Sequence, residues 1–588
     1  MRTYEIDGRR VIFDVDEALD RLEADDVLGF DIETGGLDFT RDPIATVQLF
    51  GEKTDTLALL HVRGHLPARL KRFFESPHRL FIGHNLAMFD VPFLARAGVD
   101  VYQARWYDSL IAETVITPGA RGDVRHSLKA TLKRRLGVDL KKDIDHHSWM
   151  NEELTDEQIY YAVRDVVYLP KLREAQLAQA KKLGSVTALE MEMDMLPAVI
   201  RMKERGMPIS KPALLNYLDQ QKLSLSLNTE MAARILGVKG LNPSSNKQVL
   251  EALAGIGIKA KSTRDDVLAS IIRDLAHYGD VGRRYAQGIQ AIRDARAAKT
   301  RIGYYSGDFW DKYVEPDRDY PHLGWVHANF RPCGANTGRF TSSEPNIQQV
   351  PVDMRHVFRA PPGYKVITCD YSAIEVRVAA ALANDEVMKE ALKSEDIHTT
   401  VASLVFDVPY DEVTKDQRKM AKAMNFLLLF GGGVKGLHSD ILSSGVDISE
   451  DAVKDIFSKY FGRFRGAWRM REKAQTIAHT QSQYWLEMPN GLKRLLTGNT
   501  LKPTIILNNL VQGTAGVGLK YALIDMVQSG LYKYLGITVH DEIVIIVPEE
   551  KAEWAAEELK AAMLRGMARV IDTHIKVGLV VADHWAKD

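Results

Sequence analysis

The sequence predicts a multidomain protein that combines α/β and α+β folds. Its 588 residues exceed what one hydrophobic core usually organises, so we expect several domains. Runs of apolar and β-branched residues, typical of buried strands, end in acids at Asp31 and Asp370 and border a turn at Asp541. Residues 186–300 follow the helical period instead. Acidic side chains at strand ends in two distant regions indicate two separate polar sites.

The composition is that of a folded globular protein, with 45% hydrophobic and 26% charged residues. A formal net charge of -1 neither indicates nor excludes a nucleic-acid partner. Cys333 and Cys369 are far apart and form no CxxC motif, which argues against a disulfide framework or a cysteine zinc site. Because we find no signal peptide and no run of about 18 apolar residues, we expect no membrane partner and a cytoplasmic location.

Three separated segments of the first third carry acidic residues with metal-ligand spacing. In the first, a strand before a glycine turn has Asp31 and Glu33 on one face, because strand side chains alternate. The second is a helix start at Asp90, and the third is a helix opened by a capping box at Thr155. Taken singly, these could be a solvated strand end, a helix cap and an ordinary helix surface. The full set is Asp31, Glu33, Asp90, Tyr161 and Asp165.

In this order, the three segments resemble the motifs of the DEDDy family of 3′→5′ exonucleases over residues 1–185. The resemblance implies an RNase H-like domain that binds two Mg²⁺ ions and a single-stranded DNA 3′ end. Tyr161 and Glu33 would orient the attacking water. The implied metal ligands are Asp31, Glu33, Asp90 and Asp165. A basic stretch at 125–135 is either a solvated helix face or a contact with single-stranded DNA.

Five segments of the second half resemble, in order, the motifs of family A DNA polymerases. The first begins Thr337-Gly338-Arg339, the second is a strand end, and the fourth is a helix opened by a capping box at Thr414. The fifth joins a helical segment to a hairpin. They are 337–351, 370–377, 396–400, 414–430, and 508–513 with 536–548.

Two carboxylates at the ends of neighbouring strands can hold two divalent ions about 4 Å apart for in-line phosphoryl transfer. Asp370 and Asp541 are such a pair, because the hairpin turn would push Asp541 out of its apolar sheet. The resemblance implies that these two acids and the Tyr371 carbonyl bind two Mg²⁺ ions, for which Mn²⁺ can substitute. Glu542 would be an auxiliary acid at the same catalytic centre.

Spacing of four places Arg418, Lys422 and Phe426 on one helical stripe, which offers two cations for a triphosphate and a ring for the base and sugar. A solvated basic stripe is the alternative. The resemblance identifies this helix as the O helix of the fingers, with Lys422 as proton donor to the leaving pyrophosphate. It adds Glu375, which would exclude a ribose 2′-hydroxyl. The other implied nucleotide contacts are His398, Phe430 and Tyr371.

The resemblance also implies contacts to the primer end in the minor groove, where all correct base pairs share acceptors. The implied residues are Arg339, Asn508, Gln512 and His540. The chain departs from the family pattern at four positions, so their effect on fidelity stays open: Ala373, Leu427, Phe430 and Thr504. Phe426 implies discrimination against 3′-deoxy chain terminators. Thr504 and the sequence around Asp90 resemble phage replicases more than bacterial polymerase I.

The implied layout is an RNase H-like exonuclease domain followed by a right-hand polymerase domain. The boundaries are 1–185 for the exonuclease and 186–588 for the polymerase, with the thumb at about 200–305, the palm at about 306–385 and 500–588, and the fingers at about 386–499. In the thumb, the many Lys and Arg of 258–301 would contact duplex phosphates, although interspersed acids also fit a solvated surface.

The function we expect is template-directed DNA synthesis with 3′→5′ proofreading, by a monomer acting on primer-template DNA and dNTPs in a bacterial or phage-infected cytoplasm. A processivity factor, a helicase and a single-strand binding protein are candidate partners. A single-subunit RNA polymerase has a related palm, but Glu375 and the proofreading domain argue against it. A catalytically inactive DNA-binding scaffold is disfavoured by the intact acids. Replication and repair stay open as roles.

Overall fold

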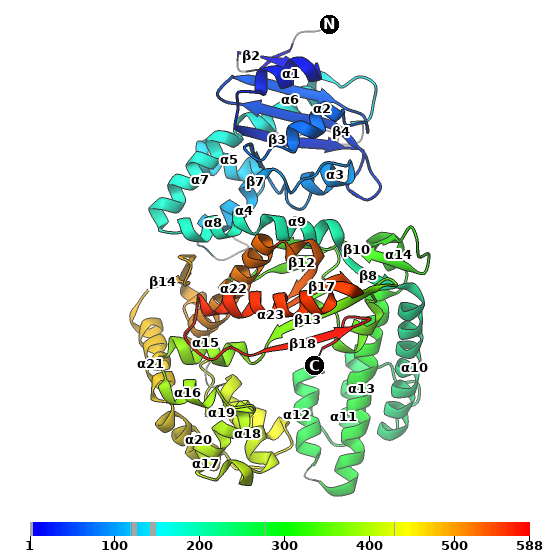
Figure 1. Ribbon diagram of the computed structural model, residues 1–588. Coiled ribbons are helices and arrows are strands. Elements are labelled where there is room, and N and C mark those ends of the chain that lie inside the picture. The colour runs from blue at the N-terminus through cyan, green and yellow to red at the C-terminus, as the bar shows by residue number, and fades with distance from the viewer. Residues whose placement is uncertain are drawn as a thin grey trace.

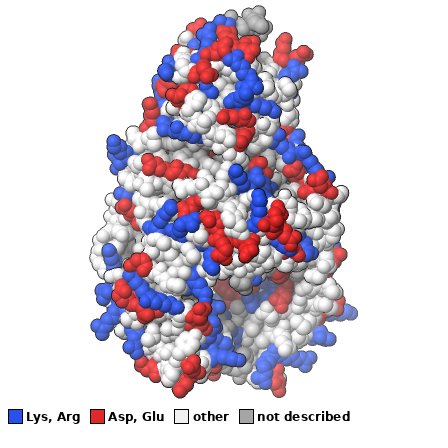
Figure 2. Space-filling view, in the orientation of Figure 1, with Lys and Arg blue, Asp and Glu red and all other residues white. Residues whose placement is uncertain are grey.

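A computed structural model describes residues 4–6, 8–117, 119, 126–140, 149–276, 278–427 and 430–587. An N-terminal sheet domain sits on a larger body, which has a central sheet and two helical arms that extend away from the N-terminal domain (Figure 1). The surface is hollowed between the two arms (Figure 2). Among the helices of these ranges, none is both long and apolar enough to cross a membrane.

The N-terminal domain is built on a seven-stranded mixed sheet with the order β1-β2-β5-β4-β3-β6-β7. The central strand β3 pairs antiparallel with β4 and parallel with β6, and helices α6 and α7 pack against it. The strands are β1 (Glu5–Ile6), β2 (Arg9–Ile12), β3 (Val27–Thr34), β4 (Ile44–Gly51), β5 (Thr56–His61), β6 (Leu80–Gly83) and β7 (Arg105–Asp108). The helices are α1 (Val15–Leu22), α2 (Ala68–Phe74), α3 (Asp90–Arg96), α4 (Ser109–Ile116), α5 (Leu128–Leu136), α6 (Asp156–Val167) and α7 (Leu169–Leu183).

The central sheet of the body is antiparallel, with the order β16-β17-β13-β18. Its inner strands β17 and β13 are rich in β-branched residues and bury most of their side chains. Helix α23 packs against the sheet and on α22 (Figure 1). The strands are β13 (Tyr364–Tyr371), β16 (Leu535–Val539), β17 (Glu542–Pro548) and β18 (Val577–Ala582). The covering helices are α15 (Ile374–Leu382), α22 (Pro503–Ser529) and α23 (Ala552–Ala568).

The first helical arm has a hydrophobic cluster of its own, separate from the main core. Its two longest helices, α10 and α13, pack along each other. The arm consists of α10 (Lys211–Leu236), α11 (Asn246–Gly255), α12 (Asp265–Ala276) and α13 (Gly279–Tyr305). Several of its basic residues bind within the arm: Arg293 pairs with Asp265, and Arg296 donates to the carbonyls of Pro243 and Thr263. These two arginines therefore hold the arm together.

The second arm carries the helix that the sequence predicts to open at Thr414. Its capping box is confirmed, because the Thr414 N–H donates to Gln417 and the Gln417 N–H donates back to the Thr414 hydroxyl. The arm consists of α16 (Glu386–Ala391), α17 (Ile397–Phe406), α18 (Lys415–Leu427), α19 (Val434–Ser443), α20 (Glu450–Arg463), α21 (Arg465–Thr480), β14 (Gln483–Glu487) and β15 (Lys493–Thr497).

Short elements join the N-terminal domain to the body. The amphipathic run from Leu189 to Arg205 is typical of one helix, but the structure has two helices that meet at Met195. The break coincides with Pro197 in the first turn of the second helix, where proline is tolerated but a continuous helix is not. The elements are α8 (Val186–Asp194), α9 (Leu196–Arg205), β8 (Met207–Ser210), α14 (Phe309–Tyr313), β9 (Val314–Pro316), β10 (Leu323–Val326), β11 (Asn329–Arg331) and β12 (Thr341–Ser343).

Candidate active sites

The acids of the N-terminal domain meet at the end of β3. Asp31 and Glu33 are partly exposed on one face of the strand, and Ile32 between them is buried on the other, as their alternation predicts. The Ile32 N–H donates to Asp90 Oδ1 over 3.1 Å, which fixes the first residue of α3 against the strand. Two segments that are distant in sequence thus bring three carboxylates together.

Helix α6 supplies the remaining two residues of this acidic cluster. The predicted capping box at Thr155 is present, and α6 packs against β3. Burial and the charges of Asp165, Glu33 and Asp31 raise the pKa of the Tyr161 phenol, which places that ring among the acids. All five predicted residues are therefore in one place. The Tyr161 ring also lies 6.1 Å from that of Trp149.

Burial of Asp90 makes its charge costly. It is 2% exposed, and desolvation together with the nearby charge of Asp108 raises the pKa of Asp90 to about 7. Asp108, which sequence reasoning missed, accepts from the N–H groups of Asn85 and Ala87 over 3.0 and 3.2 Å and caps α4. It therefore fixes the loop in front of Asp90. A cation would relieve the charge of these clustered carboxylates.

The second acidic pair lies where the central sheet meets the predicted hairpin. Two residues, His540 and Asp541, form the turn between β16 and β17, with His540 at a φ of 57°. Asp370 on β13 lies directly opposite Glu542, and the Tyr371 N–H donates to the Asp541 carbonyl over 3.3 Å. The predicted neighbouring strands are thus confirmed. Burial raises the pKa of Asp541, and the charge of Asp370 adds to the effect.

Glu542, directly opposite Asp370 in the sheet, binds protein donors through both carboxylate oxygens. Arg355 Nη1 donates to its two carboxylate oxygens over 3.2 and 2.9 Å, and Trp585 Nε1 donates to Oε1 over 2.6 Å. Arg355 also lies over the Trp585 ring, 4.3 Å from its centroid. Glu542 is 1% exposed, so these hydrogen bonds fix the start of β17 in the interior.

The donor chemistry of both acidic sites fits Mg²⁺. In the described ranges, no group of three or more His, Cys, Asp or Glu side chains is arranged to hold a metal ion by itself. Mg²⁺ prefers oxygen ligands, retains several waters and commonly shares one or two carboxylates with substrate phosphates. Open carboxylate pairs, such as Asp370 with Asp541, match that preference better than a closed cage would.

Three of the predicted substrate contacts meet beside the second pair. Glu375, on the first turn of α15, accepts from Arg339 Nη2 over 3.1 Å and from Gln512 Nε2 over 3.2 Å. Gln512 lies on α22, where Gly513 lets the 337 loop approach, since a Cβ there would lie 2.9 Å from the Thr337 oxygen. The structure therefore fixes the Glu375 carboxylate between two donors.

The predicted phosphate contacts lie on the second arm. Arg418 Nε donates to Asp396 Oδ2 over 2.6 Å, and Asp396 caps α17 by accepting from the His398 N–H. The charge of Lys422 acts on His398, so the two lie near each other. Asn425, which sequence reasoning missed, is buried, bonds His398 Nδ1 over 3.2 Å and accepts from Tyr460.

Three further predicted contacts are Phe430, Phe426 and Asn508. Helix α18 spans Lys415–Leu427, and Phe430, which we expected in the same helix, lies in a turn that the Gly432 N–H closes by donating to the Leu427 carbonyl. The Phe426 side chain lies outside the described part of the structure. Asn508 is one turn before Gln512 on α22 and lines a cavity together with Asn336 and Arg494.

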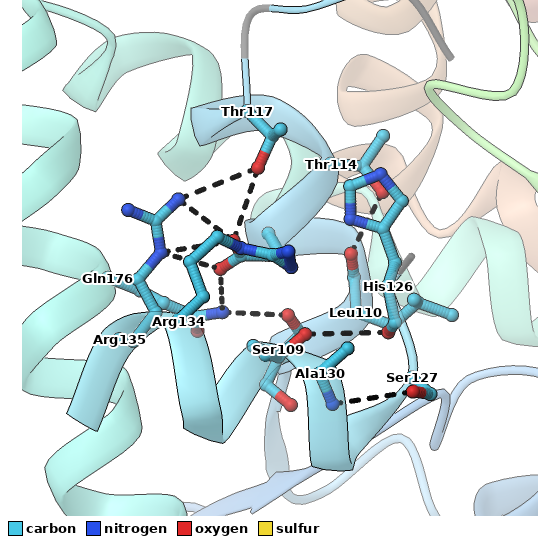
Figure 3. A network of polar contacts seen from close by, with 12 residues as sticks. Ser109, Leu110, Thr114, Thr117, His126, Ser127, Ala130, Arg134, Arg135 and Gln176 are labelled. Atoms are coloured by element: carbon cyan, nitrogen blue, oxygen red, sulfur yellow. Dashed lines mark hydrogen bonds and ion pairs between the residues drawn. The ribbon is translucent and has the colours of Figure 1, made fainter. Parts of the chain in front are cut away.

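The basic stretch at 125–135 has a structural role in part. Arg134 and Arg135 of α5 converge with Gln176 on Glu113, a fully buried acid of α4 (Figure 3). Burial opposes ionisation of Glu113, but hydrogen bonds and charges from these partners hold its pKa below the ordinary value. These two arginines therefore bind an acid within the domain. Arg125 lies outside the described residues.

A cavity of about 540 Å³ lies between the N-terminal domain and the body. Leu37, just after β3, lines it together with Phe89, Lys203 and Arg331. The Leu37 side chain is 86% exposed, although it follows the acids Asp31 and Glu33 by only a few residues. Sequence reasoning missed this leucine. Its apolar side chain therefore lies in solvent at the edge of this cavity.

The sequence was compared with known families and relatives. The profile described as DNA polymerase family A matches residues 214–587, and the one described as 3′-5′ exonuclease matches residues 11–178. DNA polymerase I of Aquifex aeolicus is 29% identical over 609 aligned residues, which cover 97% of this chain and 98% of that protein. DNA polymerase I of Pseudomonas aeruginosa is 27% identical, and the match covers 97% of this chain and 64% of that protein.

The fold also has a solved counterpart. A structure titled as the POL domain of Pol1 from M. smegmatis in complex with DNA primer-template and dNTP matches with a TM-score of 0.79 at 23% identity, over 98% of this chain and 99% of that one. The two profiles match in the order that the sequence predicted. These relatives are bacterial, so the comparisons give no support to the expected likeness to phage replicases.

Proposed function

The chain belongs to DNA polymerase family A, and on that premise we propose that it is a template-directed DNA polymerase that proofreads with its own 3′→5′ exonuclease. The single observation that carries the proposal is the presence of two separate acidic centres. One centre lies at the end of β3 in the part that matches the exonuclease profile, and the other joins Asp370 to Asp541 in the part that matches the polymerase profile.

For synthesis, Asp370, Asp541 and the Tyr371 carbonyl would hold two Mg²⁺ ions. Bound there, the ions supply charge neutralisation and activation of the primer 3′-hydroxyl toward the α-phosphate of a dNTP. The protein's own residues position the reactants: Arg418 and Lys422 face the triphosphate from α18, and Lys422 donates a proton to the pyrophosphate. His398 contributes a neutral hydrogen-bonding group to the same face, because burial lowers its pKa.

For proofreading, the acids at the end of β3 would hold two further Mg²⁺ ions, which supply a water-derived nucleophile at neutral pH. Tyr161 and Glu33 orient that water, since the phenol lies among the carboxylates. Leu37 supports the terminal base from the cavity side. The implied ligands are Asp31, Glu33, Asp90 and Asp165.

Selection of a deoxyribonucleotide rests on Glu375. Arg339 and Gln512 hold its carboxylate in place, so an extra ribose 2′-hydroxyl would meet a fixed group rather than a mobile one. Arg339, Gln512 and His540, together with Asn508, would contact the primer end through the minor groove. Replacing Glu375 by Ala should increase incorporation of rNTPs relative to dNTPs in a primer-extension assay.

The domain boundaries follow from this assignment. Residues 1–185 form the exonuclease domain and 186–588 the polymerase domain. The arm α10–α13 is the thumb, the central sheet with α22 and α23 is the palm, and the arm α16–α21 is the fingers. We further propose a monomer that acts in the cytoplasm of a bacterium on primer-template DNA and dNTPs, in replication or repair. A processivity factor, a helicase or a single-strand binding protein would be accessory partners.

Variants that separate the two acidic centres test the proposal. Asp541→Ala should abolish primer extension with Mg²⁺ and leave 3′→5′ degradation intact. The double variant Asp31→Ala with Glu33→Ala should do the reverse. Extension and degradation of one labelled primer-template report both activities in a single gel. Loss of both activities from either folded variant would contradict the two-centre proposal, and efficient RNA synthesis would contradict the assignment as a DNA polymerase.

A further inference from the structure

A lysine side chain is bound at the acidic pair of the palm. Lys587 Nζ lies 3.1 Å from Asp370 Oδ2, and the charges of Asp541 and Glu542 also act on it. The Asp370 side chain is only 17% exposed, so this ion pair is better shielded from water than a typical surface pair. A single positive charge therefore already neutralises part of the site.

The position of Lys587 is set by the segment that precedes it. Trp585 is fully buried, and its ring packs edge-on against Phe358. Its backbone N–H donates to the Phe358 carbonyl over 2.8 Å. Two residues earlier, the Asp583 carbonyl accepts from the Ala360 N–H over 2.9 Å. The backbone is thus fixed on both sides of His584, and Lys587 follows the anchor by two residues. The fold therefore holds Lys587 within reach of Asp370.

We propose that Lys587 is a resident counter-ion of the polymerase site, which a divalent ion must displace from Asp370 when it binds. This inference rests on the proposed function, because it takes Asp370 and Asp541 as metal ligands. The Asp370 oxygen that holds the ammonium group cannot coordinate an ion in the same direction. Lys587 therefore stabilises the metal-free site and sets its affinity for divalent ions.

The experiment measures binding of Mn²⁺ alone to the full chain by electron paramagnetic resonance. All variants carry Asp31→Ala and Glu33→Ala, so that the measured Mn²⁺ is bound at the palm site. Lys587→Met removes the charge and keeps a flexible side chain of similar length, and it should tighten Mn²⁺ binding about threefold or more. Lys587→Arg should keep the affinity of the parent. Lys576→Met is the matched control, because Lys576 pairs with the exposed Glu395 over 2.7 Å.

Raised salt gives a second readout, since screening weakens the ion pair and should shrink the difference between Lys587→Met and the parent. Equal or weaker Mn²⁺ binding by Lys587→Met would overturn the inference, as would an equal gain from Lys576→Met. Asp370→Ala separates this result from the proposed function. If Asp370→Ala leaves Mn²⁺ binding unchanged, the palm metal site itself is wrong; if it weakens binding while Lys587→Met has no effect, only the counter-ion is wrong.

Discussion

Trp585 donates its indole N–H to Glu542 Oε1 over 2.6 Å, a contact between buried residues that are 43 positions apart. Hydrogen bonds to charged groups contribute about 1.5–3 kcal/mol, and a buried acceptor left short of a donor costs a similar amount. We therefore expect Trp585→Phe, which keeps an aromatic ring against Phe358, to lower the free energy of unfolding of the palm by about 2 kcal/mol.

Primer extension after a heat challenge measures this change, and 3′→5′ degradation serves as the internal reference. Trp485→Phe is the matched control, since Trp485 is 43% exposed on β14 and should change stability by less than about 0.5 kcal/mol. Equal heat resistance of the two variants would mean that the bond to Glu542 contributes nothing.

The Glu113 cluster leads to a prediction for the exonuclease domain. Glu113 is completely buried and Arg135 Nη2 lies 2.8 Å from its carboxylate, so Arg135→Met leaves a buried charge with fewer partners. Removing one partner of a buried pair costs about 3–5 kcal/mol, and the low end applies because Arg134 and Gln176 remain. The exonuclease activity of Arg135→Met should be lost at a lower temperature than that of the parent.

Lys133→Met on the same helix provides the control. Lys133 pairs with Asp139 over 3.0 Å, and both side chains are more than half exposed, so the loss should stay below about 1 kcal/mol. Primer extension should be unaffected in both variants. If Lys133→Met were as heat-sensitive as Arg135→Met, burial of Glu113 would not be the cause.

A second buried ion pair joins the connecting helices to the palm. Lys520 of α22 pairs with Glu192 of α8, both almost fully buried, and Cys333 donates to Glu192 over 2.9 Å. Lys520→Met should destabilise the protein by about 3–5 kcal/mol, because Glu192 then keeps a buried charge without its cation. The double variant Lys520→Met with Glu192→Leu should recover most of that loss, since two apolar side chains replace the pair.

Urea unfolding of the parent, the two single variants and the double variant gives the coupling energy of the pair. A coupling near zero, with additive single effects, would contradict an energetic link between α8 and α22. Cys333→Ala removes a weak donor to Glu192 and a weak acceptor for the Lys520 ammonium group. It should change the free energy of unfolding by less than either single replacement of Lys520 or Glu192.

Features set by local sequence could be predicted. The alternation at Asp31 and Glu33, the capping boxes at Thr155 and Thr414, and the two-residue hairpin turn before Glu542 all depend on neighbours within a few positions. Each follows from a local rule of strand or helix geometry, so it can be predicted from a single sequence.

Partners that tertiary packing brings together could not be predicted. Arg355 and Glu542 are 187 positions apart, and nothing near either residue indicates the other. For the same reason, the basic stretch on α5 gave no sign that two of its arginines serve Glu113 while Lys133 faces solvent. Asp108 acts through backbone N–H groups and Asn425 through the side chains of His398 and Tyr460, and such contacts leave no motif.

His398 leads to a prediction about pH. Burial lowers the pKa of its imidazole below 6.5, and the charges of Arg418 and Lys422 act in the same direction against that of Asp396. Between the folded pKa and 6.5, the unfolded chain binds more protons than the folded one, so stability rises with pH. The contribution of a neutral His398 is therefore complete above pH 6.5 and is lost as the pH falls below that value.

The free energy of unfolding of the fingers, measured from pH 5 to 8, should fall on acidification with a slope from this group of at most about 1.4 kcal/mol per pH unit. His398→Gln should flatten the curve, because glutamine does not titrate. His479→Gln, on the exposed face of α21, should keep the slope of the parent. An unchanged slope in His398→Gln would show that its surroundings do not shift the pKa of the imidazole.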